Sequence, residues 1–264
     1  MKDIARKKIV QQYYSKRARD YDRQKIRTWK SKQGFGAKII NEIFDALAGS
    51  EGKPILEVGV GSGRIGSSLL EKVKPWFVGL DLSKEMLRLA KAKMFPYKHK
   101  FDLILGDAEH LPFVNSVFNA MICISTVHYF ALPERSLTEF SRVLKEKGVF
   151  VYGDVTLHEL DNRGFLDALE RALSKAHARY YKSSEMQKLL ENCGFYVSKT
   201  EVIPYRKSYL ALIEDKGIYF NVKPEALYEF IQRATMDERK LYAIGNNELT
   251  LLYTLIIALK ESKS

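Results

Sequence analysis

Apolar residues in this chain gather in short, nearly continuous runs, separated by stretches in which apolar positions recur every three or four residues. Five such runs, rich in Val, Ile, Leu and Phe, lie at 55–59, 76–80, 101–106, 118–125 and 148–155. Their composition is typical of strands that are buried on both faces of a parallel sheet. Helical patterns lie between them at 64–73, 83–94 and 134–146. The alternation predicts an α/β fold built on a Rossmann-like, doubly wound sheet.

The second half of the chain continues the alternation with longer helical stretches. Helix, short helix, strand, helix and strand are expected in turn at 163–181, 183–195, 195–203, 224–241 and 249–259. The short helix begins at two serines, so Ser183 or Ser184 is expected to cap it. The two strands of this half bring the expected total to seven.

A glycine-rich loop follows the first expected strand, in the segment EVGVGSGRIG at 57–66. Gly61 and Gly63 begin a G-x-G-x-x-G pattern, and Asp81 lies twenty residues after Gly61, the spacing expected of an acidic residue that binds ribose hydroxyls. Every nucleoside-binding α/β sheet needs such a turn and such an acceptor. The loop alone therefore leaves two cofactor classes open, a dinucleotide that carries hydride and a sulfonium that carries a methyl group.

Three features favour the methyl donor. Glu57 lies inside the first expected strand, two residues before Gly59. The third expected strand ends in an acidic residue followed by a small one, in GDAEHLPF at 106–113. No Tyr-x-x-x-Lys pattern lies in the segment between the fourth and fifth expected strands, and no second domain is evident that would carry a substrate to a nicotinamide ring.

Five landmarks in order resemble the class I S-adenosylmethionine-dependent methyltransferases, especially the ubiquinone and menaquinone biosynthesis branch. They are YYSKRARDYD, ILEVGVGSGR, GLDLSKEML, GDAEHLPF and SRVLKEKGVFVYGD. The resemblance runs from about Tyr14 to about Phe195. It implies S-adenosyl-L-methionine as the cofactor, and a seven-stranded sheet whose last strand is antiparallel and inserted between the fifth and the sixth.

The resemblance also assigns cofactor-binding roles. The three glycines bring the backbone close to the cofactor, the carboxylates accept its hydrogen bonds, and the remaining residues pack on it or face its sulfonium. The implied residues are Glu57, Gly59, Gly61, Gly63, Asp81, Leu82, Asp107, Ala108 and Ser125. Simpler roles stay open for some of them, because Asp81 or Ser83 would also serve as a helix cap, and Glu57 would also serve to anchor the N-terminal arm.

Catalytic residues are harder to identify from the sequence. Methyl transfer from a sulfonium is an in-line displacement, so the enzyme must position the reactants and exclude water, and a base is optional. His128, Ser125 and Tyr21 are the first candidates, followed by Tyr14, Thr126, Tyr129 and Asp154. Histidine titrates in the range suited to a general base. At the start of an expected helix, however, His128 would equally serve as a packing or capping residue.

The formal charge of +11 is concentrated at the N-terminus, where residues 1–38 hold thirteen Lys or Arg and three Asp. Tyr13, Tyr14, Tyr21 and Trp29 lie among these charges, and KAHARYYK at 175–182 repeats the combination. Basic side chains suit phosphates, and aromatic faces suit unstacked bases. This composition favours an RNA base, in rRNA or tRNA, as the substrate.

Two alternatives to RNA stay open. The first is a small-molecule O-, N- or C-methyltransferase with the arm as a solvated lid, and the second is a binding protein that keeps the cofactor fold without catalysis. The segment STVHYF at 125–130 lacks the paired prolines common in enzymes that methylate exocyclic base amines. This departure weakens, without excluding, methylation of a base amine.

The remaining composition restricts the class of protein. Two cysteines, Cys123 and Cys193, and no cluster of the five histidines predict a cytoplasmic protein without disulfides or a metal site. The apolar run at 249–259 is too short to span a bilayer, so no membrane association is expected.

The chain shows neither an internal repeat nor a low-complexity linker, so we expect a single methyltransferase domain over 1–264. It would comprise a basic N-terminal helical arm at 1–50, a cofactor-binding core at 51–204, and a C-terminal helical insertion with the last strand at 205–264.

Overall fold

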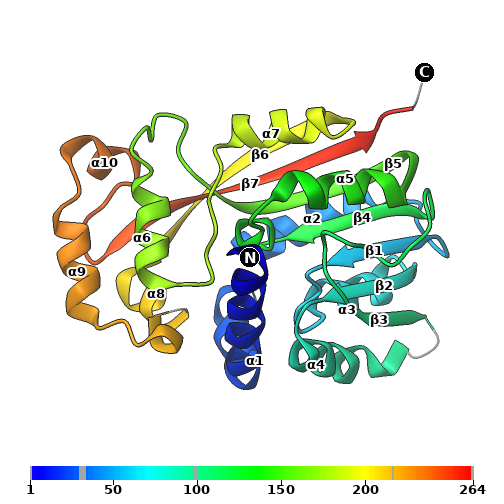
Figure 1. Cartoon of the computed structure of the whole chain (residues 1–264), viewed down its shortest axis with the longest axis horizontal. Helices are drawn as coiled ribbons and strands as arrows, with labels where there is room; N and C mark the ends of the chain where they lie inside the picture. The colour runs from blue at the N-terminus through cyan, green and yellow to red at the C-terminus, as the bar shows by residue number, and fades with distance from the viewer. Residues whose placement is uncertain (1, 30–33, 98–99, 216, 263–264) are drawn as a thin grey trace.

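One mixed sheet forms the centre of the molecule. In the residues that the computed structural model describes, 2–29, 34–97, 100–215 and 217–262, seven strands pair in the order β3-β2-β1-β4-β5-β7-β6 (Figure 1). The strands are β1 (Pro54–Val58), β2 (Trp76–Asp81), β3 (Phe101–Leu105), β4 (Phe118–Ile124), β5 (Leu144–Thr156), β6 (Phe195–Ser208) and β7 (Glu248–Lys260). The predicted α/β fold with seven strands is confirmed.

The pairing of the strands also matches the topology that the sequence implied. β1 pairs in parallel with β2 on one side and with β4 on the other. β3 pairs in parallel with β2, and β5 with β4. β7 is antiparallel to both β5 and β6, between which it lies. The prediction that the last strand is antiparallel and inserted between the fifth and the sixth is confirmed.

Helices cover both faces of this sheet. They are α1 (Lys2–Trp29), α2 (Phe35–Ala46), α3 (Arg64–Lys72), α4 (Lys84–Met94), α5 (Pro133–Val143), α6 (Phe165–Leu173), α7 (Ser183–Asn192), α8 (Tyr209–Asp215), α9 (Pro224–Gln232) and α10 (Met236–Leu241), with short 3-10 turns at 95–97, 127–129 and 217–220. Residues of α2, α3 and α4 share one buried apolar cluster with the sheet, and residues of α5 and α7 share another. The two clusters make a three-layered α/β/α core.

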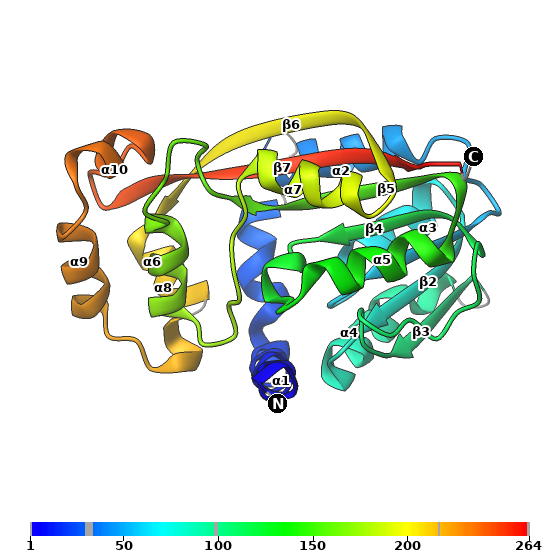
Figure 2. The ribbon, with the colours of Figure 1, turned by 45° about the horizontal axis from the view of Figure 1, so that its top comes forward.

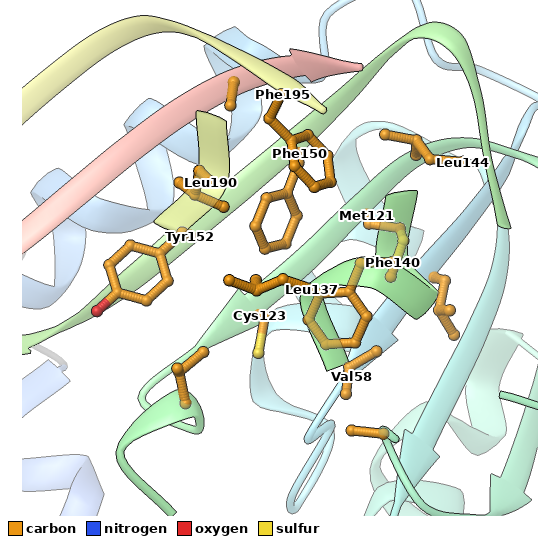
Figure 3. Packing of buried hydrophobic residues seen from close by; sticks show 14 of the residues in the cluster. Val58, Met121, Cys123, Leu137, Phe140, Leu144, Phe150, Tyr152, Leu190 and Phe195 are labelled. Atoms are coloured by element: carbon orange, nitrogen blue, oxygen red, sulfur yellow. The ribbon is translucent and has the colours of Figure 1, made fainter. Parts of the chain in front are cut away.

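Aromatic side chains fill the layer beneath α5 and α7. Figure 3 shows Phe150 of β5 between Phe140 and Phe195. The ring centroid of Phe150 lies 5.6 Å from that of Phe140 and 5.3 Å from that of Phe195. All three side chains are fully buried. The layer therefore joins α5, the interior strand β5 and the edge strand β6.

A second group of helices lies at the far end of the long strands. Figures 1 and 2 both show α6, α8, α9 and α10 beside the ends of β6 and β7, with α1 between this group and the rest of the molecule. These helices form an apolar cluster of their own, which includes Leu249 and Leu251 of β7. We call it the C-terminal cluster.

Two helical predictions for this half were wrong in detail. The pattern at 163–181 is helical only as far as Leu173. The reason is Asp167, whose Oδ1 accepts from the Tyr180 amide at 2.7 Å and lies 2.7 Å from His177 Nε2, so the chain folds back. The segment 224–241 is two helices, because Thr235 caps a new helix with Glu238 as its partner.

Other boundaries differ by less. Lys182, rather than either predicted serine, is the N-cap of α7, and its backbone N–H donates to Glu185 at 2.9 Å. β6 continues to Ser208, five residues beyond the apolar run. β6 is an edge strand whose side chains are mostly exposed or partly exposed, so polar residues occupy much of it and conceal its length.

The aromatic layer makes a stability prediction. We expect Phe150→Ala to lower the free energy of unfolding by about 3–5 kcal/mol, because a fully buried ring is lost and its neighbours cannot fill the cavity. Leu160→Ala is the control, since that side chain is 68% exposed, and its effect should stay within about 0.5 kcal/mol. Urea unfolding of both variants measures the difference, and equal effects would contradict the role given to Phe150.

Candidate active site

The carboxyl ends of β1 to β4 lie along one edge of the sheet and enclose a cavity of about 1080 Å³, here called the first cavity. It lies where the strand order reverses between β1 and β4, the position at which open α/β sheets bind ligands. Among the residues singled out in the sequence, those that line it are Tyr14, Tyr21, Glu57, Gly59, Gly61, Asp81, Leu82, Ser83, Asp107, Ala108, Ser125, Thr126 and Tyr129. Gly63 is not among its lining residues.

Two glycines of the loop, Gly59 and Gly63, adopt a left-handed backbone conformation, and a side chain is excluded at each for a different reason. Gly59 has a φ of +75°, and a Cβ there would lie 2.3 Å from Thr126 Oγ1. The loop therefore approaches the end of β4 as closely as a bare backbone allows. Gly63 has a φ of +74°, but a Cβ there would lie 2.9 Å from Ala90 Cα, so Gly63 permits the packing of α3 on α4 instead of lining the cavity.

Asp81 joins the end of β2 to the glycine loop. Its Oδ2 accepts from the Gly61 amide at 2.8 Å, and its Oδ1 accepts from the Ser83 amide at 2.8 Å. Ser83 supplies the cap of α4 by accepting from Met86 N at 3.3 Å, so Asp81 does not have to. Burial raises the pKa of Asp81 to about 6, against the lowering effect of these backbone hydrogen bonds. A carboxylate oxygen has two lone pairs, so Asp81 keeps acceptor capacity on the cavity wall.

Glu57 is a buried carboxyl group at the bottom of the first cavity. Its Oε2 has no hydrogen-bond partner, although the side chain is fully enclosed. Burial raises its pKa to about 8, opposed by the charge of Arg64 and a hydrogen bond from the Gly66 backbone. An unsatisfied buried oxygen in a cavity wall marks a place where a ligand donor fits.

Asp107 closes the opposite wall together with α1. Lys7 Nζ lies 2.7 Å from Asp107 Oδ2 and 2.8 Å from Glu109 Oε2. Burial acts to raise the pKa of Asp107, but the hydrogen bonds from Lys7 and from the Glu109 amide hold it below its ordinary value. The carboxylate expected to face an adenine ring therefore also holds the N-terminal helix.

α1 lies over the first cavity and is fixed to its rim by several polar contacts. Besides the ion pairs of Lys7, Gln11 Nε2 donates to the Leu82 carbonyl at 3.1 Å. Ser15 Oγ donates to Glu85 Oε2 at 2.5 Å. These residues are four apart, as the contacting face of one helix requires. The N-terminal helix is thus a lid docked on α4 and the strand ends.

A second cavity, of about 820 Å³, adjoins the first. The two cavities share the lining residues Tyr14, Tyr21, Arg64, Ser125 and Tyr129. Burial raises the pKa of Tyr14 and Tyr129, and likewise of Tyr180 and Tyr253 deeper in the second cavity, well above the ordinary value. These phenols are therefore neutral near pH 7, and the second cavity is aromatic with polar hydroxyls.

His128 and Asp154 form a buried pair in the wall of the second cavity. The imidazole Nδ1 lies 2.7 Å from Asp154 Oδ1, and the His128 amide donates to Oδ2 at 3.1 Å. A hydrogen bond to a carboxylate places the proton on Nδ1 and leaves Nε2 as an acceptor. Nε2 is buried and has no hydrogen-bond partner. Ser125, with a φ of +53°, lies nearby with its Oγ 3.2 Å from the Tyr253 hydroxyl.

The aromatic residues expected to stack on RNA bases lie largely inside the protein. Tyr13 is buried against Phe220, and Tyr14 and Tyr21 line both cavities. In the segment 175–182, three aromatic side chains are buried, those of His177, Tyr180 and Tyr181. The side chain of Trp29 lies outside the described part of the structure.

The sequence did not identify several residues that line the cavities. They are Lys7, Gln11, Arg17, Tyr205, Lys207 and Asp215. A signal was present for those on α1, because Lys7, Gln11, Tyr14, Arg17 and Tyr21 recur every three or four residues. The aggregate charge of the arm concealed that periodicity. For Lys207 and Asp215 the sequence offered no signal, since they join the site only through the pairing of β6 and the return of α8.

The described residues contain neither a cluster of potential metal ligands nor a helix able to span a membrane. Within them, no group of three or more His, Cys, Asp or Glu side chains is arranged to hold a metal ion. Among the helices that the structure describes, none combines the length and the apolar composition that crossing a bilayer requires.

Comparison with known proteins gives a consistent result. Residues 56–152 match the family described as a methyltransferase domain. An uncharacterized protein of Methanocaldococcus jannaschii, MJ1252, is 24% identical over 85% of this chain and 84% of its own length. The malonyl-[acyl-carrier protein] O-methyltransferase of Geobacter sulfurreducens is 28% identical over 60% of this chain and 62% of its own.

A solved structure shares the fold. A protein of Bacillus halodurans superimposes with a TM-score of 0.78 at 23% identity, covering 86% of this chain and all of that one. The glycine loop, Asp81 and Asp107 all fall inside the matched domain or its cavity. Residues 56–152 are therefore a methyltransferase domain, and the chain is an S-adenosylmethionine-dependent methyltransferase with the class I fold.

Proposed function

We propose that this enzyme methylates a small molecule held in the second cavity, with S-adenosylmethionine in the first. One observation carries the proposal: the two cavities adjoin and share five lining residues, and side chains of α1 line both. A donor and an acceptor placed in adjoining cavities under one lid meet the need to align the reacting atoms and exclude water.

The same arrangement disfavours an RNA base as substrate. A base flipped from RNA needs an open approach and exposed aromatic faces. Here Tyr14 and Tyr21 line the cavities, and Lys7 already forms ion pairs with two carboxylates. The Geobacter relative is named for O-methyl transfer to a malonyl group, which supports a non-nucleic-acid acceptor. Membership of the ubiquinone and menaquinone biosynthesis branch and a cytoplasmic location remain predictions.

The chain's residues fit the cofactor. S-adenosylmethionine supplies a methyl group on a positively charged sulfonium with a good leaving group. In our proposal the free acceptor capacity of Asp81 receives the ribose hydroxyls, Glu57 Oε2 receives donors near the amino-acid end, and Leu82 packs on the adenine. Asp107 and the Ala108 amide bind the adenine edge, so that the adenine amino group shares Asp107 with Lys7.

His128 is the proposed general base. Its Nε2 takes the proton from the nucleophilic atom of the acceptor, while Asp154 fixes the tautomer and stabilises the imidazolium. Ser125 and Tyr21 lie where the two cavities meet, so their hydroxyls orient the acceptor towards the donor. The docked helix α1 keeps water away from both the acceptor and the methyl donor.

The proposal is tested by following the methyl group. Purified enzyme is incubated with S-adenosylmethionine labelled in its methyl group, together with total RNA and a small-molecule extract, and the fractions are separated. We expect label in the small-molecule fraction. Label in RNA alone, or in neither fraction, would overturn the proposal.

A second experiment tests the base. His128→Ala should lower kcat for the labelled acceptor by about 10²-fold while S-adenosylhomocysteine binds as before. His158→Ala is the matched control, because His158 lines neither cavity. If His128 is only a packing residue, Tm falls and kcat stays near that of the unmodified enzyme.

A third experiment tests the cofactor role of Asp81. Asp81→Ala should weaken S-adenosylhomocysteine binding by about 2–4 kcal/mol in calorimetry, because two charge-assisted hydrogen bonds are lost. Asp102→Ala is the control, as Asp102 is an exposed acidic residue of β3. The unmodified enzyme should not bind a nicotinamide dinucleotide. Undiminished binding by Asp81→Ala would remove Asp81 from the site.

A further inference from the structure

Arg17 of α1 is buried in the wall of the second cavity, with 2% of its surface exposed. Its Nη1 donates to the Tyr13 hydroxyl at 2.9 Å. Its Nε and Nη2 are buried and have no hydrogen-bond partner. These two nitrogens form one edge of the guanidinium, the pair of parallel donors that binds a carboxylate or a phosphate side-on.

The nearest carboxylate does not satisfy this edge. Asp215 Oδ1 lies 3.7 Å from Arg17 Nη2, which is too long for a hydrogen bond. The other oxygen of Asp215 pairs closely with Lys207 of β6. One carboxylate thus faces both the buried Arg17 and the partly buried Lys207 at this end of the second cavity.

The other carboxylates near the second cavity have partners of their own. Asp154 is paired with His128. Glu170 is hydrogen-bonded to Tyr180. The charge of Arg64 acts on Glu57 at the border with the first cavity. Among the charged groups described around this cavity, the Nε and Nη2 edge of Arg17 is therefore a position at which an external anion fits.

We propose that the methyl acceptor carries an anionic group, a carboxylate or a phosphate, which binds side-on to Nε and Nη2 of Arg17 with Lys207 contributing charge. This inference rests on the proposed function, because it describes the molecule that occupies the second cavity. The ring of Tyr21 lies 5.0 Å from the Arg17 guanidinium and also lines the first cavity. Tyr21 thus connects the anion-binding end with the junction where the methyl group is transferred.

The anion is assigned to the acceptor rather than to the cofactor because of where Arg17 lies. Arg17 lines the second cavity and is not among the lining residues of the first. The amino-acid carboxylate of S-adenosylmethionine would need Arg17 in the first cavity. Saturation with S-adenosylhomocysteine therefore leaves the Arg17 site available to a second ligand.

The test uses four probes of one length on enzyme saturated with S-adenosylhomocysteine. Hexanoate and hexyl phosphate carry the two anions, and hexanamide and hexanol are their neutral counterparts. We expect at least one anionic probe to bind tenfold or more tighter than both neutral probes in calorimetry. The tighter of the two anions identifies whether the acceptor carries a carboxylate or a phosphate. Equal binding of charged and neutral probes would overturn the proposal, without any variant being needed.

Variants assign the effect to Arg17. Arg17→Met should abolish the preference for the anionic probe, and Arg17→Lys, which keeps the charge without the paired donors, should retain only part of it. Lys16→Met is the matched control, because Lys16 is the exposed neighbour on α1 and its loss should leave the preference intact. A preference that persists in Arg17→Met would overturn the proposal.

Two further readouts separate this inference from the proposed function. If Arg17→Met weakens S-adenosylhomocysteine binding tenfold or more, the anion is the cofactor's own carboxylate and the inference is overturned. If the probes show no anion preference while label still reaches a small molecule, the inference fails and the proposed function stands. If label reaches only RNA, the proposed function fails, whatever the probes show.

Discussion

Parallel pairing of β1 with β2 on one side and β4 on the other is the constraint on which the rest of this molecule depends. It brings the carboxyl ends of the strands to one edge, and it sends their connecting helices to opposite faces of the sheet. Gly59, Asp81, Asp107 and Ser125 are distant in sequence and become neighbours for this reason alone. The left-handed turn at Gly59 then lets the loop after β1 approach the end of β4 without a steric clash.

The N-terminal helix shows how a strongly basic segment can place its charge inside a protein. Lys7 reaches two carboxylates at the rim of the first cavity, and Arg17 is enclosed by tyrosines beside the second. Burying a cation is unfavourable unless charge and hydrogen bonds compensate for it. A basic charge excess on an N-terminal helix therefore does not by itself predict a polyanionic partner. The spacing of the basic residues along the helix decides which of them face the protein interior and which remain exposed to solvent.

The sequence was sufficient for the sheet and for most of the first cavity, and insufficient for the second. Buried parallel strands have an apolar signature, and the acidic residues at their ends keep fixed positions relative to the glycine loop, so Glu57, Asp81 and Asp107 were identifiable. Gly63 does not line the first cavity, and its close approach to Ala90 arises from helix packing that no local pattern encodes. Lys207 and Asp215 join the second cavity through the long pairing of β6 with β7, which brings together residues far apart in the chain.

β7 contributes residues to all three of the larger apolar clusters and so connects the sheet to the C-terminal cluster. The described residues lining the first cavity all precede residue 132, whereas those lining the second extend to Tyr253. Genetic divergence or recombination in the later part of the chain can therefore reshape the second cavity while every wall of the first is inherited unchanged. In evolutionary terms the first cavity is encoded by the earlier part of the chain alone and the second by both parts, with α1 contributing to each.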